Sequence, residues 1–129
     1  MLALAAAAML ALGVPGDRAA ASYAGSTVTL VLHYEMTCGQ PGPGPLVVRL
    51  PARFRLANVR AIVDGKQQSR AVNDSTVTID LPRPPKVTCM SITEGKLAVR
   101  VTGVHAPRGL WTIRATLPRH AFAARLRVG

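Results

Sequence analysis

The sequence predicts an antiparallel β-sandwich of about seven to nine strands, and three observations support this. Apolar residues recur with a period of two along most of the chain, as in strands that bury one face. Turn-forming residues separate these runs at intervals of about eight to twelve residues. No stretch after the first apolar run keeps a helical period. The 129 residues suffice for one domain, and its core must be aliphatic because aromatic residues make up only 4% of the chain.

The N-terminal residues predict a secretory leader. The run M-L-A-L-A-A-A-A-M-L-A-L-G-V is apolar and uncharged, and it is shorter than the roughly 20 residues that a bilayer-spanning helix needs. Cleavage after Ala21 or Ala24 fits the preference for small residues. We therefore expect residues 1–24 to be a signal peptide and residues 25–129 to be a secreted or extracytoplasmic domain without a transmembrane anchor. An N-terminal helix of the folded protein is the alternative.

The segment Ser26–Cys38 is the clearest predicted strand, because its even positions from Val28 onward are all apolar and its odd positions are polar except Val31. Cys38 shares the parity of the apolar set and is expected to point inward. The second of the two cysteines, Cys89, lies in another apolar run, V-T-C-M-S-I. In an exported domain such a pair predicts a Cys38–Cys89 disulfide. The bridge would enclose about fifty residues and stabilise the fold by roughly 4 kcal/mol in the chain-entropy model.

The middle of the chain divides into short strands and turns. Prolines and glycines in 39–45 predict a loop, and Pro51 ends a short strand over 46–50. A strand over 57–63 leads into Asp64-Gly65, a strong hairpin pattern, so Lys66–Val72 is expected to return as one edge strand. The remaining expected elements are a turn at Asn73-Asp74, a strand over 76–81, a crossing at Pro82–Lys86, a strand at Val87–Ile92, a hairpin turn at Glu94-Gly95, and strands over 96–102, 111–117 and 121–128.

The hairpin before the last strand carries a resemblance. Its pattern Pro107-x-Gly109-x-Trp111-x-Ile113 resembles the late hairpin of secreted bacterial immunoglobulin-like domains. The resemblance implies an immunoglobulin-like sandwich and an extracytoplasmic setting, but no activity, because such folds serve many functions. The tryptophan follows both cysteines rather than lying between them, which departs from antibody-type domains.

The chain is strongly basic, with a net charge of +10, and most of its 16 basic residues are arginine. Much alanine, glycine and proline accompanies the arginine, which is typical of a high-GC bacterium. Arg114, Arg125 and Arg127 fall on outward positions of the last two strands and could form one polyanion-binding face. Solvated surface charge is the other interpretation. No aromatic residues are interleaved with these arginines, which argues against specific nucleic-acid recognition. The other arginines expected on outward strand positions are Arg49, Arg60 and Arg100.

The chemistry of the side chains favours a binding or structural role over catalysis. The sequence lacks G-x-S-x-G, H-E-x-x-H and a phosphate-cradling glycine loop, and its acids sit mostly at turns. We expect no enzyme and no cofactor, but a module of the bacterial cell envelope whose partner is an anionic cell-wall polymer or an envelope protein. The alternative is a periplasmic-type copper carrier, since imidazole, thioether and thiol groups suit copper(I). Its candidate ligands beside the cysteines are His33, Met36 and Met90, although His33 and Met36 have opposite strand parity.

Overall fold

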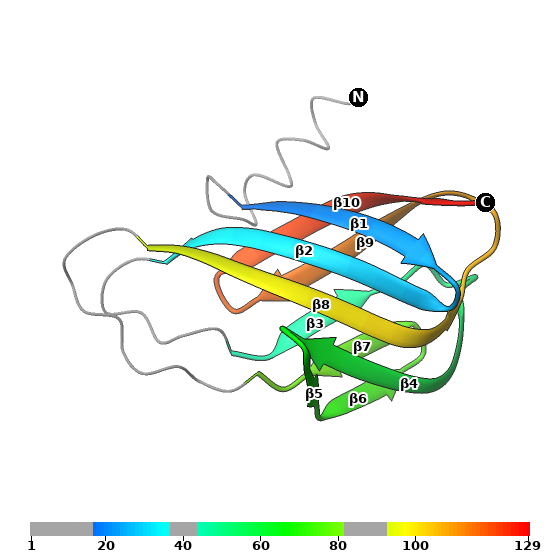
Figure 1. The fold of residues 1–129 in the computed structure, drawn as a ribbon, viewed down its shortest axis with the longest axis horizontal. Coiled ribbons are helices and arrows are strands. Elements are labelled where there is room, and N and C mark those ends of the chain that lie inside the picture. Colours follow the sequence, from blue (N-terminus) through cyan, green and yellow to red (C-terminus); the bar gives the residue numbers. More distant parts are fainter. Residues whose placement is uncertain (1–16, 37–43, 82–92) are drawn as a thin grey trace.

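Two antiparallel sheets of five strands each form the described part of the protein (Figure 1). The predicted antiparallel sandwich is confirmed, but these ten strands exceed the predicted seven to nine. The computed structural model describes residues 17–36, 44–81 and 93–129. Sheet A has the strand order β1-β2-β8-β4-β5, and sheet B has the order β10-β9-β3-β7-β6. The strands are β1 (Arg18–Ala24), β2 (Thr27–Met36), β3 (Leu46–Arg49), β4 (Arg55–Val63), β5 (Lys66–Gln68), β6 (Arg70–Asn73), β7 (Thr76–Ile79), β8 (Thr93–His105), β9 (Gly109–Leu117) and β10 (His120–Val128).

The apolar residues that alternate along the strands form the core between the two sheets. In β2, Val28, Leu30, Leu32 and Tyr34 are buried, as the alternation predicts. The inward residues of β9 and β10 meet them from the other sheet, and most of the core side chains are aliphatic. Packing of these apolar faces against each other is the main source of the fold's stability. Within the described ranges, the structure contains no helix long and apolar enough to span a membrane.

Strand β1 is an addition to the predicted elements. It pairs with β2 over its whole length, from Arg18 opposite His33 to Ala24 opposite Thr27. Its alternate residues Ala19, Ala21 and Tyr23 pack against the core. The sheet therefore includes residues that the sequence analysis assigned to the leader, and the positions after Ala21 and Ala24 fall within and at the end of this strand.

Two predicted elements differ in the structure. The return segment Lys66–Val72 is not one strand, because β5 pairs with β4 in sheet A while β6 pairs with β7 in sheet B. The chain changes sheets at Ser69, whose carbonyl accepts a hydrogen bond from the Asp80 amide at 2.9 Å. The expected hairpin turn at Glu94-Gly95 is wrong, since both residues lie inside β8 opposite Glu35 and Tyr34. Gly95 has no side chain because a Cβ there would collide with the Tyr34 ring.

The turns between neighbouring strands largely follow the sequence. The Asp64-Gly65 hairpin is confirmed, with both residues at positive φ (50° and 83°) as a type I′ turn requires. The next turn lies at Asp74 and Ser75, one residue later than predicted.

A bulge bends β4 where it pairs with β8. The pairing register shifts between Leu56 and Arg60, and Asn58 takes a positive φ of 52°. Gly103 on β8 faces this bulge at φ 78°, where a Cβ would collide with the Ala57 carbonyl. The shift explains why Ala57 is exposed while Val59 is buried, although strict alternation in a strand over 57–63 would put both on one face.

The two edges of the sandwich are joined in different ways. At one edge the chain itself passes from β5 to β6, whereas at the other edge β1 and β10 contact each other (Figure 1). There Asp17 Oδ1 lies 2.9 Å from His120 Nδ1, and the Ala121 amide donates to Asp17 Oδ2 at 3.3 Å. The two side chains are only 3% and 8% exposed. The Tyr23 hydroxyl adds a hydrogen bond to the Val104 carbonyl at 2.7 Å, which ties β1 to β8.

Candidate anion-binding face

Four arginines share the outer face of sheet B. Arg49 of β3 lies directly opposite Arg114 of β9, and Arg114 lies opposite Ala123 of β10. Arg125 and Arg127 have the same outward parity on β10 as Ala123. All four side chains are exposed. The structure thus places Arg114, Arg125 and Arg127 on neighbouring strands, as expected, and adds a fourth member; we call Arg49, Arg114, Arg125 and Arg127 the arginine face.

The arginine face has no acidic residue within its own strands. None of β3, β9 and β10 contains Asp or Glu. Its positions between the arginines are occupied by small or neutral side chains such as Thr112 and Ala123, which are the cross-strand partners of Arg125 and Arg114. Two like charges directly opposite each other, Arg49 and Arg114, repel, so the sheet gains nothing in stability from this pair. The arrangement produces a positive potential over a flat surface.

The other two outward arginines, Arg60 and Arg100, are exposed but lie on sheet A. That face carries charges of both signs. Arg18 Nη2 lies 3.1 Å from Glu94 Oε1, and the same oxygen is 3.4 Å from His33 Nδ1. Glu35 lies opposite Glu94 across β2 and β8. The six predicted outward arginines therefore divide into four on sheet B and two on sheet A.

The predicted copper ligands are only partly described. His33 is half-buried on the outer face of β2, and its Nδ1 atom is buried without a hydrogen-bond partner. Met36 is the last residue of β2. Met90, Cys38 and Cys89 lie outside the described residues, so the predicted disulfide stays a prediction. Within those residues, no three His, Cys, Asp or Glu side chains come together in a group that could hold a metal ion.

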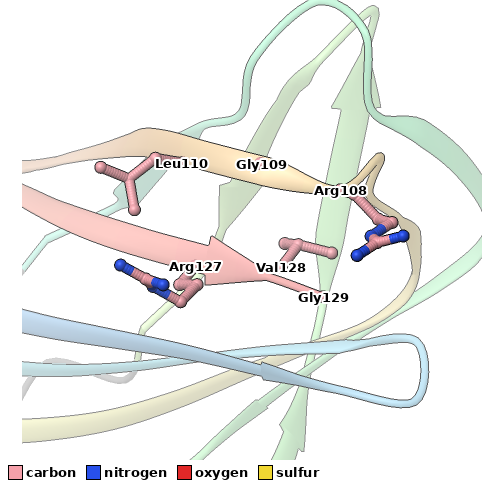
Figure 2. A pocket seen from close by; sticks show the side chains of 6 residues that line it. All are labelled: Arg108, Gly109, Leu110, Arg127, Val128 and Gly129. Atoms are coloured by element: carbon pink, nitrogen blue, oxygen red, sulfur yellow. The ribbon is translucent and has the colours of Figure 1, made fainter.

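An open pocket of about 480 Å³ lies at the end of the β9–β10 hairpin opposite its turn (Figure 2). Leu110 is 57% exposed there, and its cross-strand partner is Arg127. Leu110 was not among the predicted site residues, although its position has the same outward parity as Thr112, Arg114 and Thr116. Arg108 lies on the other side of the pocket in Figure 2. The residues that line the pocket are Arg108, Gly109, Leu110, Arg127, Val128 and Gly129.

Titratable groups in the core have a structural role. Burial raises the pKa of the Tyr34 hydroxyl, and the nearby Asp64 carboxylate raises it further. The Tyr34 ring packs against His120 with centroids 5.0 Å apart and against Phe122 at 6.3 Å. This ring cluster lies beside the Asp17 contact at the β1–β10 edge. It stabilises that edge, because packed aromatic rings stabilise a fold by more than the burial of their apolar area alone.

No family model matches the sequence, and the search of curated proteins found none similar to it.

Proposed function

We propose that the protein is an exported, non-catalytic binding module of the bacterial cell envelope that associates with anionic polymers through the arginine face. The observation that carries this proposal is the gathering of four exposed arginines on three adjacent strands that contain no acidic residue. If the basic residues only reflected the composition of the chain, they would be distributed over the outer faces of both sheets, with acidic residues among them. Here one face is mixed and the other is uniformly positive.

The geometry of a sheet favours a polymer over a small anion. Outward residues on one strand repeat about every 7 Å, and neighbouring strands are about 5 Å apart, so the arginines present a flat array of charges. A chain with regularly spaced anions can contact several of them at once. Each contact is weak and screened beyond about 8 Å at physiological salt, so binding depends on their number.

The strand order supports an immunoglobulin-like fold. Strands β1-β2-β8-β4 have the order and positions of strands A, B, E and D of an immunoglobulin domain, and β10-β9-β3 those of G, F and C. The segment β5–β7 is then an insertion that extends both sheets. This topology agrees with the resemblance found in the sequence, which also implied an extracytoplasmic setting.

The proposed disulfide fits the pairing of β2 with β8. Met36 at the end of β2 lies opposite Thr93 at the start of β8. Cys38 follows Met36 by two residues, and Cys89 precedes Thr93 by four. Both cysteines therefore belong to chain segments that leave the same end of one strand pair, which supports a Cys38–Cys89 bridge.

The proposed leader must end before Asp17 if β1 is part of the mature domain. Cleavage after Ala21 or Ala24 would remove the buried Asp17 carboxylate and most or all of β1, including in the second case the Tyr23 hydroxyl bond. We therefore revise the boundary towards the N-terminus. The intact mass of the exported protein tests this revision: a mature chain that includes Asp17 supports it, and one starting at Ser22 or Gly25 contradicts it.

Retention on a column carrying polyphosphate tests the proposed function. A triple variant with Arg114, Arg125 and Arg127 changed to glutamine should elute at much lower salt than the wild type. The matched control changes Arg60, Lys96 and Arg100 to glutamine, which removes the same charge from sheet A. Both should keep nearly the wild-type melting temperature, because exposed charges contribute little to stability. Equal elution of the two variants would contradict the proposal.

A copper(I) carrier is the second candidate, favoured by His33 Nδ1, a buried atom that makes no hydrogen bond although Glu94 Oε1 lies 3.4 Å away. Titration of copper(I) into reduced and oxidised protein separates the two functions. Stoichiometric binding that persists in the oxidised protein and is lost in His33→Ala would support the carrier. Absence of binding leaves the polymer-binding module.

A further inference from the structure

We propose that the end of the arginine face around Leu110 docks onto an anionic lipid bilayer, with Leu110 entering the boundary between headgroups and acyl chains. This proposal rests on the proposed function, because it uses the same arginines. It adds a partner with an apolar layer beneath its charges.

The first observation is the exposure of Leu110. Its side chain is outward on β9 and 57% exposed, in a position between the arginines and the end of the sheet. The pocket beside it is open, and two of the residues that line it, Gly109 and Gly129, contribute no side chains. Exposure of a leucine side chain to water is unfavourable, and its transfer into an apolar layer lowers the free energy.

The second observation is the charge that surrounds this leucine. Arg127 is its direct cross-strand partner, and Arg125 follows on the same face of β10. Arg108 extends on the other side of the pocket (Figure 2). A leucine flanked by arginines matches the layering of an anionic membrane, where phosphates lie above the apolar region. A soluble polyanion satisfies the arginines alone and gives Leu110 no partner.

The second exposed large apolar residue of the described chain provides a matched control. Val72 is 43% exposed, but it lies on β6, at the opposite edge of sheet B from β10. The two side chains are thus similar in exposure and differ in whether the arginine face surrounds them. If hydrophobicity alone drove membrane binding, both would contribute.

The test is flotation of the full folded domain with two kinds of vesicle at low salt. One kind contains phosphatidylglycerol and phosphatidylcholine in equal parts, and the other contains phosphatidylcholine alone. We expect binding to the first kind only. Leu110→Ser should weaken it roughly tenfold, as expected for loss of a buried leucine side chain, and should leave polyphosphate retention unchanged. Arg127→Gln should weaken both, by roughly fivefold for vesicles. Val72→Ser should change neither.

The outcomes separate this proposal from the proposed function. If wild-type protein is retained by polyphosphate but does not float with anionic vesicles, the lipid proposal fails and the polymer-binding function stands. The lipid proposal also fails if Leu110→Ser floats as well as the wild type, or if Val72→Ser weakens flotation equally. If the wild type binds neither polyphosphate nor vesicles, both proposals fail. Melting temperatures confirm that each variant is folded.

Discussion

The two outer faces of the sandwich carry arginines in opposite settings. On sheet A, Glu94 Oε1 lies 3.1 Å from Arg18 Nη2 and 3.4 Å from His33 Nδ1, so an acid lies directly beside a basic side chain. On sheet B, Arg114 has Arg49 as a cross-strand neighbour, and no acid occurs in β3, β9 or β10. The difference shows that the number of basic residues says little about a binding surface. The position of the acids relative to them decides where an anion is attracted.

Neither face is needed for the fold. Exposed ion pairs such as Arg18–Glu94 stabilise a protein by about 0 to 1 kcal/mol, and the Arg49–Arg114 pair is repulsive. Stability comes from the apolar residues between the sheets and from the contacts at the sheet edges. The charges of either face can therefore be changed while the protein stays folded, which makes the comparison testable.

The largest effect is expected from separating β1 from β10, which loosens the edge of sheet A and leaves the arginine face in place. Asp17→Ala removes one partner of a buried pair and should lower the free energy of unfolding by about 3 kcal/mol. Asp80→Ala, at an exposed position, should change it by less than about 0.5 kcal/mol. Urea unfolding measures both. Equal losses of stability in the two variants would mean that the Asp17–His120 contact does not hold the edge. The Asp17→Ala variant that remains folded should still bind polyphosphate, because its arginine face is unchanged.

The second-largest effect, on polyphosphate affinity, is expected from introducing acidic residues on the outer face of sheet B. Thr112→Glu with Ala123→Glu places a carboxylate opposite Arg125 and another opposite Arg114. Polyphosphate affinity should fall roughly tenfold, with a shallower salt dependence, because fewer arginines remain to replace counterions.

Thr29→Glu with Thr102→Glu makes the same change opposite Arg100 and Arg60 on sheet A. This control should lower polyphosphate affinity by no more than about twofold. It reduces the net charge of the protein, but the added carboxylates lie away from the arginine face and salt screens their effect on a ligand there. If the control lowers it as much as the sheet B variant does, the two faces are equivalent.

A smaller effect is expected from making sheet A more like sheet B. Glu94→Gln removes the carboxylate beside Arg18 and His33. Polyphosphate retention should rise slightly, and the free energy of unfolding should change by less than about 0.5 kcal/mol because the Arg18 and Glu94 side chains are exposed. A rise as large as the loss in the sheet B variant would show that sheet A also binds.

The smallest effect at neutral pH comes from Tyr34, which lies in the core beneath both faces. Its raised pKa means that the folded protein holds the hydroxyl proton more tightly than the unfolded chain does. Stability from this group is complete below the ordinary tyrosine pKa of about 10 and falls as pH rises beyond it. Tyr34→Phe should lose less stability than the wild type between neutral and alkaline pH. Parallel pH profiles would contradict the assignment.

Local patterns predicted much of the fold. The alternation around Leu30 and Leu32 placed the core face of β2, and the Asp64-Gly65 pair predicted a true hairpin. The outward parity of Arg114, Arg125 and Arg127 was enough to predict their shared face, because β9 and β10 are consecutive in sequence and pair directly.

Contacts between distant residues account for the rest. Residues 18–24 are rich in alanine and follow an apolar run, which is typical of the end of a leader. The contact that holds this segment at the β10 edge joins the preceding residue, Asp17, to His120, which is 103 positions away. Gly95 was predicted to be part of a turn because glycine is common in turns. The structure explains this glycine differently: a Cβ at this position would collide with the Tyr34 ring on the neighbouring strand β2. The change of sheet at Ser69 depends on its bond to the Asp80 amide, which no local pattern indicates.

Backbone amide chemical shifts during titration with polyphosphate test most directly whether the arginine face is the binding surface. We predict that shifts concentrate in β3, β9 and β10, around Arg49, Arg114, Arg125 and Arg127, and reverse when salt is added. Residues near Arg60 and Arg100 on sheet A should change little. Shifts spread evenly over both faces, or centred on sheet A, would contradict the account.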